Sequence, residues 1–291
     1  MENRFTQKDE GIILCAVGSM PYYQRCNTLI RDIQAQMPDT AIAVYTDSPS
    51  EIIGADIVIN GSHNPNFIFL SKIIACQKSP FYRSIFIDVD CRLLKDVSHV
   101  FDILQKHDIG LTFANSRKIL KKDDWRPNET GIPLCTSTLV FKKNSKVSNL
   151  FIEWEKHYLE QELFPGRSDQ LYFQYLLYRD TSIRYFLLPD EYHFNTDHPT
   201  FVAGSIKILT SAVSDYDAKG KYSLEKLNSI FNPVGVFERL AYVKILGSSP
   251  WKKAFKYLRP RIVVITIYKA KEKKIMLGLK RIIKSLLPKQ N

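Results

Sequence analysis

The stretch SIFIDVD, residues Ser84 to Asp90, decides the fold. Its apolar residues 85–87 predict a short buried strand, and two carboxylates, Asp88 and Asp90, follow that strand directly. Ligands of open α/β sheets bind beyond the carboxyl ends of the strands, and carboxylates buried there are costly unless they meet a cation. Because both acids are spaced to reach one ion, the stretch predicts a Mg²⁺ or Mn²⁺ site that also holds substrate phosphates.

A polar turn after a strand is the simpler alternative, since Asp is common in turns and one Asp-x-Asp pair is a weak motif. The metal site is favoured because the acids follow a clearly apolar strand and a similar strand-then-helix unit lies upstream, at residues 11–36.

The rest of the chain up to about residue 210 alternates between strand and helix patterns. Strands are predicted at 11–17, 41–45, 56–59, 85–87, 109–113, 137–141, 184–188 and 206–209, and helices at 23–36, 69–78, 97–106, 147–161 and from 169 onward. This alternation predicts an α/β fold with a doubly wound, mostly parallel sheet flanked by helices.

Length and composition place the chain among globular proteins, with 291 residues of which 45% are hydrophobic. We expect one large domain at 1–221 and a helical C-terminal extension at 222–291. The five cysteines are odd in number and lack metal-like spacing, which predicts reduced thiols in a cytoplasmic setting. The polar start of the sequence does not resemble a signal peptide, and no apolar run is long enough to span a membrane.

The net charge of +11 is concentrated at the C-terminal end. Residues 251–291 contain 13 Lys and Arg and one acid, Glu272, so this segment carries +12 and the other 250 residues carry −1. Residues 271–287 place their apolar side chains on one helical face and their cations on the other. We predict a peripheral helix at the inner face of an anionic membrane, with packing on its own domain as the alternative. Nucleic acid is not expected as a partner, because the body lacks a basic face.

Residues 115–131 form a long polar connection, rich in Lys and Arg. A loop of this length predicts a mobile segment with a function, and a plain surface excursion is the alternative.

The acid pair belongs to a wider set of short motifs between residues 11 and 211. The first strand-to-helix turn spans Ala16 to Tyr23, Tyr45-Thr46-Asp47 ends a second strand, and Lys72 lies on the helix before the acids. Asp169-Gln170 opens a later helix, followed by a Leu-Pro-x-x-Tyr tract that begins at Leu188. With these motifs the chain resembles GT-A-fold glycosyltransferases, nearest to glycosyltransferase family 8, the glycogenin-like and bacterial galactosyltransferases.

The resemblance implies an enzyme that moves a hexose, with retention, from a nucleotide-diphosphate sugar, a UDP-sugar above all, to a glycan or lipid-linked acceptor in cell-surface polysaccharide synthesis. It assigns nucleotide contacts to Ala16, Tyr23, Tyr45, Asp47, Lys72 and Asp88, metal binding to Asp88 and Asp90, and the sugar-side catalytic positions to Asp169 and Gln170. For Asp169 a simpler interpretation exists, because an acid in the first turn of a helix interacts favourably with the helix dipole.

The chain departs from the family pattern at two places. Thr136-Ser137-Thr138 stands where the family has Asn-Ser/Thr-Gly, and no His follows the late strand near Thr210 as a third metal ligand. His193 and His198 precede that strand and are the candidates nearby, although each also fits a surface histidine.

Two other functions fit parts of the sequence. A haloacid dehalogenase-like phosphatase also has Asp-x-Asp after a strand, with the first Asp as nucleophile. It normally has Thr two residues after the second Asp, where this chain has Arg92, and its late acidic pair would have to be Asp123-Asp124. A non-catalytic membrane-surface protein is the other alternative, which predicts lipid binding without nucleotide binding.

Overall fold

The computed structural model describes residues 9–114, 133–162, 169–195, 202, 204–210 and 222–232. The predicted loop at 115–131, the candidate ligand His198 and the basic segment at 251–291 lie outside these described residues. Among the described helices, none has the length and apolar content required to cross a membrane.

The centre of the fold is a seven-stranded sheet with strand order β3-β2-β1-β4-β7-β6-β8. Its strands are, in chain order, β1 (Glu10–Ala16), β2 (Ala41–Thr46), β3 (Ile57–Asn60), β4 (Arg83–Ile87), β6 (Ile109–Phe113), β7 (Leu134–Lys142) and β8 (Tyr185–Leu188). All neighbouring pairs are parallel except those of β7, which runs antiparallel to β4 and to β6. The fold class predicted from the sequence is therefore confirmed, and the sheet is consistent with a GT-A-like fold.

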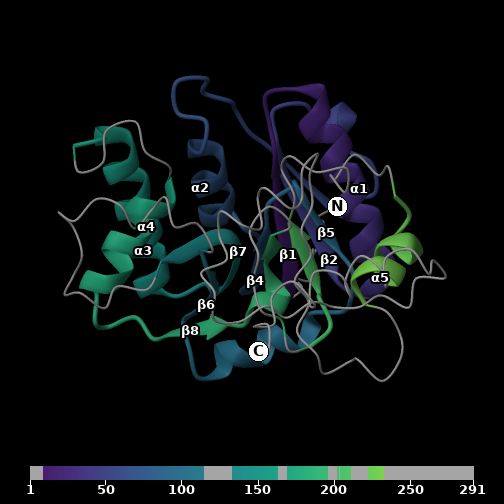
Figure 1. Ribbon diagram of the computed structural model, residues 1–291. Helices are drawn as coiled ribbons and strands as arrows, with labels where there is room; N and C mark the ends of the chain where they lie inside the picture. Colours follow the sequence, from purple (N-terminus) through teal and green to yellow (C-terminus); the bar gives the residue numbers. More distant parts are fainter. Residues whose placement is uncertain are drawn as a thin grey trace, which may run out of the picture.

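Helices cover both faces of this sheet (Figure 1). They are α1 (Met20–Gln36), α2 (Leu70–Gln77), α3 (Ser145–Glu160), α4 (Asp169–Arg179) and the 3-10 helices η1 (Pro49–Glu51), η2 (Ser98–Gln105) and η5 (Asp190–Tyr192). Along β1 the side chains alternate, so Ile12 and Leu14 pack with α1 and η2, while Ile13 packs with α2, α3 and α4. Two apolar layers result, one on each face of the sheet.

The ends of several helices differ from the sequence prediction. Helix α1 begins at Met20, three residues earlier than expected, with Pro21 in its first turn, where the missing N–H of proline costs nothing. The segment predicted as a helix at 97–106 is the 3-10 helix η2, whose terminal bonds join residues three apart, as between Val100 N and Val97 O. Helix α3 begins at the N-cap Asn144, whose side chain accepts a hydrogen bond from Val147 N.

A second, three-stranded sheet has the order β5-β10-β9, with β5 (Cys91–Leu93), β9 (Phe194–Asn195) and β10 (Ile208–Thr210). The sequence predicted β10 approximately, at 206–209, and did not predict β5 or β9. Arg92 of β5 is buried and forms an ion pair with Asp32 of α1, with Nη2 3.0 Å from Oδ1, which fixes this sheet against the main body.

Helix α5 (Leu224–Phe231) is the first element after the predicted domain boundary at 221/222. Its Leu227 is buried in an apolar cluster with Leu94, Phe194 and Leu209 of the small sheet region. Its Asn228 donates a hydrogen bond to Leu94 O. The position of the boundary itself stays a prediction.

Candidate functional site

A cavity of about 550 Å³ lies beyond the carboxyl ends of β1 and β4. Its wall comprises Cys15, Val17, Gly18, Ser19, Tyr22, Arg25, His63, Ile68, Phe69, Lys72, Asp88, Val89 and Asp90. Its position is the one at which open α/β sheets bind ligands, and its volume suits a small organic ligand.

The two carboxylates of the acid pair face this cavity from a tight turn between β4 and β5. Asp88 N donates to Ser137 O of β7 at 2.9 Å, and Cys91 N donates back to Asp88 O at 3.0 Å. Between the acids, Val89 is 5% exposed and packs in the apolar layer beside α1. This anchored valine makes Asp88 and Asp90 project to the same side.

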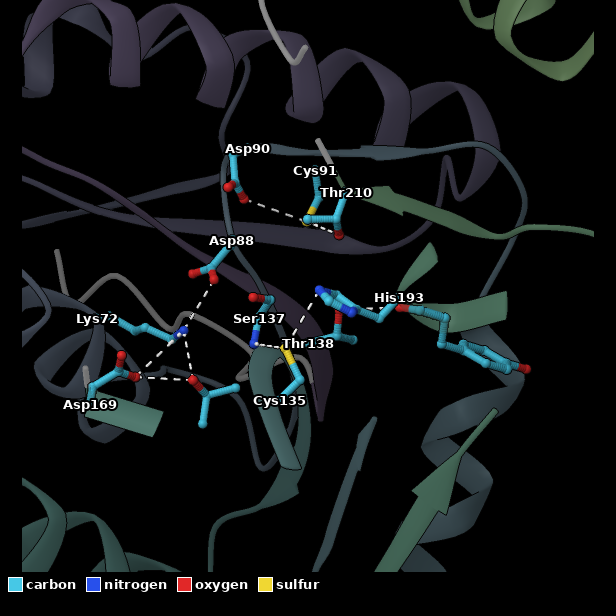
Figure 2. Close-up of polar contacts among 12 residues, drawn as sticks. Lys72, Asp88, Asp90, Cys91, Cys135, Ser137, Thr138, Asp169, His193 and Thr210 are labelled. Carbon is cyan, nitrogen blue, oxygen red and sulfur yellow. Dashed lines mark hydrogen bonds and ion pairs between the residues drawn. The ribbon is translucent and has the colours of Figure 1, made fainter. Parts of the chain in front are cut away.

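Lys72 of α2 connects three elements of the site, as Figure 2 shows. Its Nζ lies 3.1 Å from Asp88 Oδ2 and 3.7 Å from Asp169 Oδ2, and it donates to Thr136 Oγ1 at 3.1 Å. Thr136 in turn donates to Asp169 Oδ2 at 3.0 Å. The predicted residues Lys72, Asp88 and Asp169 are thus brought together in one hydrogen-bonded network.

Burial and neighbouring charges perturb the titration of this network. Burial alone would lower the pKa of Lys72, but the charges of Asp88 and Asp169 raise it above its usual value. Burial raises the pKa of Asp90, and the negative charge of Asp88 raises it further. Burial also raises the pKa of Asp169, against the opposing charge of Lys72. Lys72 is therefore charged at neutral pH, and burial disfavours the charged forms of Asp90 and Asp169.

The residues present fit a hard divalent cation. Asp88 and Asp90 offer carboxylate oxygens, the donors that Mg²⁺ and Mn²⁺ prefer. Burial first, and the charge of Asp88 second, raise the pKa of Asp90, and a bound cation would stabilise its charged form. Within the described ranges no three His, Cys, Asp or Glu side chains are grouped to hold a metal. Two carboxylates suit an ion that takes its other ligands from water and substrate phosphates.

Asp169 and Gln170, the predicted sugar-side residues, open helix α4. Asp169 is 3% exposed, and its backbone oxygen accepts a hydrogen bond from Trp154 Nε1, so its place is fixed by the core as well as by Lys72. The Nε2 of Gln170 is buried and has no hydrogen-bond partner among the residues that the structure describes, an arrangement that usually costs free energy. Neither residue contributes to the cavity wall described above, and their catalytic role stays a prediction.

Tyr23 and Asp47 meet at the first strand-to-helix turn. The Tyr23 hydroxyl donates to Asp47 Oδ1 at 2.8 Å, and Gly18 N donates to Asp47 Oδ2 at 3.1 Å. Gly18 has φ +89°, and a Cβ there would lie 3.0 Å from His63 Nε2, so the turn requires glycine. Asp47 therefore holds the turn at one edge of the cavity.

Ala16 and Tyr45, also predicted to contact nucleotide, are buried in the sheet and are absent from the cavity wall. The Tyr45 hydroxyl accepts a hydrogen bond from Ser62 N at 3.1 Å. Their contribution to nucleotide binding stays a prediction, and the structure places them behind the wall.

A buried pair of Cys135 and His193, not predicted from the sequence, lies beside the acid pair (Figure 2). Cys135 Sγ and His193 Nε2 are 3.5 Å apart. Burial would raise the pKa of the Cys135 thiol, but His193 lowers it below its ordinary value. His193 is a predicted candidate for the third metal ligand. Its Nε2 contacts the sulfur of Cys135, and its buried Nδ1 has no partner among the described residues.

Two departures from the family pattern have structural explanations. Thr136 lies within β7, where its hydroxyl joins Lys72 to Asp169, a function that sequence position alone did not reveal. Thr210, where a histidine was missing, is paired with Cys91 Sγ at 3.2 Å. Arg92, the residue that weakened the phosphatase alternative, is buried in its ion pair with Asp32.

Comparisons with known proteins find similarity among solved structures only. No family model and no curated protein matches the chain. Among solved structures, the glycosyltransferase GlyE of Streptococcus pneumoniae TIGR4 is similar, with 14% sequence identity and a TM-score of 0.47. The similarity covers 72% of this chain and 56% of GlyE, so the chain spans little more than half of that protein.

Proposed function

We propose that the protein is a metal-dependent glycosyltransferase that moves a hexose from a UDP-sugar to a glycan or lipid-linked acceptor. The observation that carries the proposal is the cavity at the carboxyl ends of β1 and β4, where Asp88, Asp90 and Lys72 lie together on the wall. This set suits a diphosphate, which requires both a cation and the ligands that hold one.

The chain's own residues would bind the donor in three places. Asp88 and Asp90 would hold Mg²⁺ or Mn²⁺ beside the diphosphate, while the turn fixed by Gly18, Tyr23 and Asp47 would support the nucleoside. Lys72, held 3.1 Å from Asp88, would supply a fixed positive charge at the diphosphate. Because Asp88 now pairs with Lys72, metal binding would have to share or displace that contact.

Cleavage of the sugar–diphosphate bond develops negative charge on the leaving diphosphate. A bound divalent ion supplies Lewis-acid stabilisation of that charge. Lys72 stabilises it as well, because Asp169 and Thr136 hold the ammonium group in place without a large reorganisation. Asp169 and Gln170 would orient the sugar, and the unpartnered Nε2 of Gln170 would gain a hydroxyl partner there.

The test is calorimetric titration of the full-length protein with UDP and a panel of UDP-hexoses, with and without Mn²⁺. We expect Mn²⁺-dependent binding of UDP, followed by transfer or slow hydrolysis of one sugar. Absence of any UDP binding at millimolar concentration would remove the proposal. Release of phosphate from simple phosphomonoesters, without nucleotide-sugar turnover, would favour the phosphatase alternative instead.

We further propose that residues 251–291, which lie outside the described residues, bind a cytoplasmic enzyme to the anionic inner face of a membrane. The segment carries 13 Lys and Arg, and each cation near an anionic surface contributes about 1 kcal/mol. Sedimentation with phosphatidylglycerol vesicles tests this directly. The full chain should sediment with these vesicles. About 0.5 M salt should release part of it, because the Debye length is then only roughly 4 Å and the charges are screened. Equal recovery with neutral vesicles would contradict it.

A further inference from the structure

Arg25 of α1 also contributes to the cavity wall. It lies in the N-terminal part of this helix, which begins at Met20. Its guanidinium lies over the ring of Tyr22, with Cζ 5.8 Å from the ring centroid. Stacking on an aromatic ring restricts the guanidinium plane while leaving its N–H groups able to donate. Arg25 was not among the residues predicted from the sequence.

The Nε of Arg25 is buried, and no residue in the described ranges accepts a hydrogen bond from it. Within the part of the chain that the structure describes, no carboxylate forms an ion pair with Arg25, whereas Lys72 has two. A buried N–H of a charged group without an acceptor is costly, and an anion in the cavity would supply one.

The charges around the cavity show what Arg25 could balance. Asp88, Asp90 and Asp169 carry three negative charges, which Lys72 and a divalent ion would neutralise in full. A bound diphosphate brings at least two further negative charges into this neutral set. Arg25 is the remaining wall residue with a permanent positive charge, so it is the group that can offset the diphosphate.

Arg25 also shares its surroundings with the acid pair. Arg25, Asp88 and Asp90 all lie on the wall of this one cavity. A metal ion at Asp90 and an anion beside that metal would therefore both lie within the electrostatic reach of Arg25.

We propose that Arg25 is a phosphate-binding residue of the cavity, donating to oxygens of the donor diphosphate beside the metal site. His63 completes this subsite, since its Nδ1 is likewise buried without a partner and its ring packs against Gly18. The inference deepens the proposed function and rests on it. It assigns to α1 a direct contact with the leaving group.

The experiment is calorimetric titration of UDP into the full chain at saturating Mn²⁺, comparing the wild type with Arg25→Gln. Losing charge-assisted hydrogen bonds should weaken UDP binding by about tenfold or more, with Mn²⁺ binding alone unchanged or tighter. Arg25→Lys should recover part of the affinity, because a lysine keeps the charge without the fork of donors.

The matched control is Arg31→Gln on the same helix, since Arg31 is exposed and donates only locally, to Thr28 Oγ1. This variant should bind UDP as the wild type does. UDP affinity within twofold of wild type in Arg25→Gln overturns the inference while leaving the proposed function intact. A wild type that binds no UDP contradicts the proposed function, and titration with inorganic pyrophosphate and Mn²⁺ then tests Arg25 by itself. Unchanged pyrophosphate affinity in Arg25→Gln would overturn the inference in that case.

Discussion

Lys72 and Asp88 form an ion pair of 3.1 Å that joins the first turn of α2 to the turn after β4. The same ammonium group lies 3.7 Å from Asp169 at the start of α4. One cation therefore connects three segments that are separated by up to 97 residues, from Lys72 to Asp169.

Replacing Lys72 by Met should lower the free energy of unfolding by about 3 kcal/mol at pH 7.5, because the buried Asp169 and the half-buried Asp88 lose their cation. The loss of Lys72 raises the pKa of Asp169 further above its unfolded value. A raised carboxyl pKa destabilises the ionised native state, so the variant should regain stability as the pH falls through that pKa. Urea unfolding at pH 7.5 and 5 measures this. An equal deficit at both values would contradict it, and the exposed Lys106→Met is the control.

Asp90→Asn should separate stability from function. Burial and Asp88 raise the pKa of Asp90, so its charge destabilises the metal-free native state at neutral pH, and the neutral amide removes that repulsion. We expect an unchanged or higher melting temperature without metal, together with a loss of Mn²⁺-dependent UDP affinity of more than about tenfold. Calorimetry measures the melting temperature and the UDP affinity of Asp90→Asn and of a control, Asp102→Asn, at an exposed position. Full UDP affinity would show that Asp90 holds no metal.

Gln170→Ala should affect turnover more than binding. If its free Nε2 meets the sugar only as the bond breaks, kcat should fall by about tenfold while UDP affinity stays within twofold. Steady-state kinetics with the active UDP-sugar and calorimetry with UDP give the two numbers. A parallel loss of UDP affinity would place Gln170 at the nucleotide, and the exposed Gln105→Ala should change neither.

Asp108, far from the acid pair, provides a test of stability against pH. Burial would raise its pKa, but Arg184 N, Lys142 and Asn144 hold the carboxyl pKa below its usual value. A depressed pKa means that its stabilisation is present above about pH 4 and is lost as the pH falls through the folded value. Asp108→Asn should therefore cost about 2 kcal/mol at pH 7 and progressively less below pH 4. A deficit that is constant with pH, measured by urea unfolding, would contradict this.

The main sheet could be predicted from the sequence because its signals are local. Apolar runs such as Ile85 to Ile87, and breaks such as Pro38 and Pro80, lie within a few residues of the element they determine. Strands β5 and β9 are only three and two residues long, and β5 is identified only by its pairing with β10, which joins Leu93 to the distant Ile208. No window of sequence contains that pairing.

The candidate site could be predicted where its residues follow a strand end or begin a helix. Asp88 and Asp90 follow a strand end and Lys72 lies in the first turn of α2, and the structure brings all three to one cavity. The sequence did not predict Thr136, Arg25 or the Cys135–His193 pair. Thr136 and Cys135 matter because of partners that are distant in the sequence, Lys72 and His193. Ala16 and Tyr45 were assigned from the ends of their strands, and the depth of those ends below the wall was not visible in the sequence.

The antiparallel position of β7 has a consequence for biosynthesis. Strand β4 pairs with β1 on one side and β7 on the other, yet β7 is completed only at Lys142, long after Ile87. At roughly 5–20 residues per second on the ribosome, β4 remains an unpaired edge for several seconds. An open apolar edge invites pairing with another nascent chain, and charged residues at an edge oppose it. The charges of Asp88 and Asp90 lie just beyond the end of that edge at Ile87, where we expect them to disfavour such pairing.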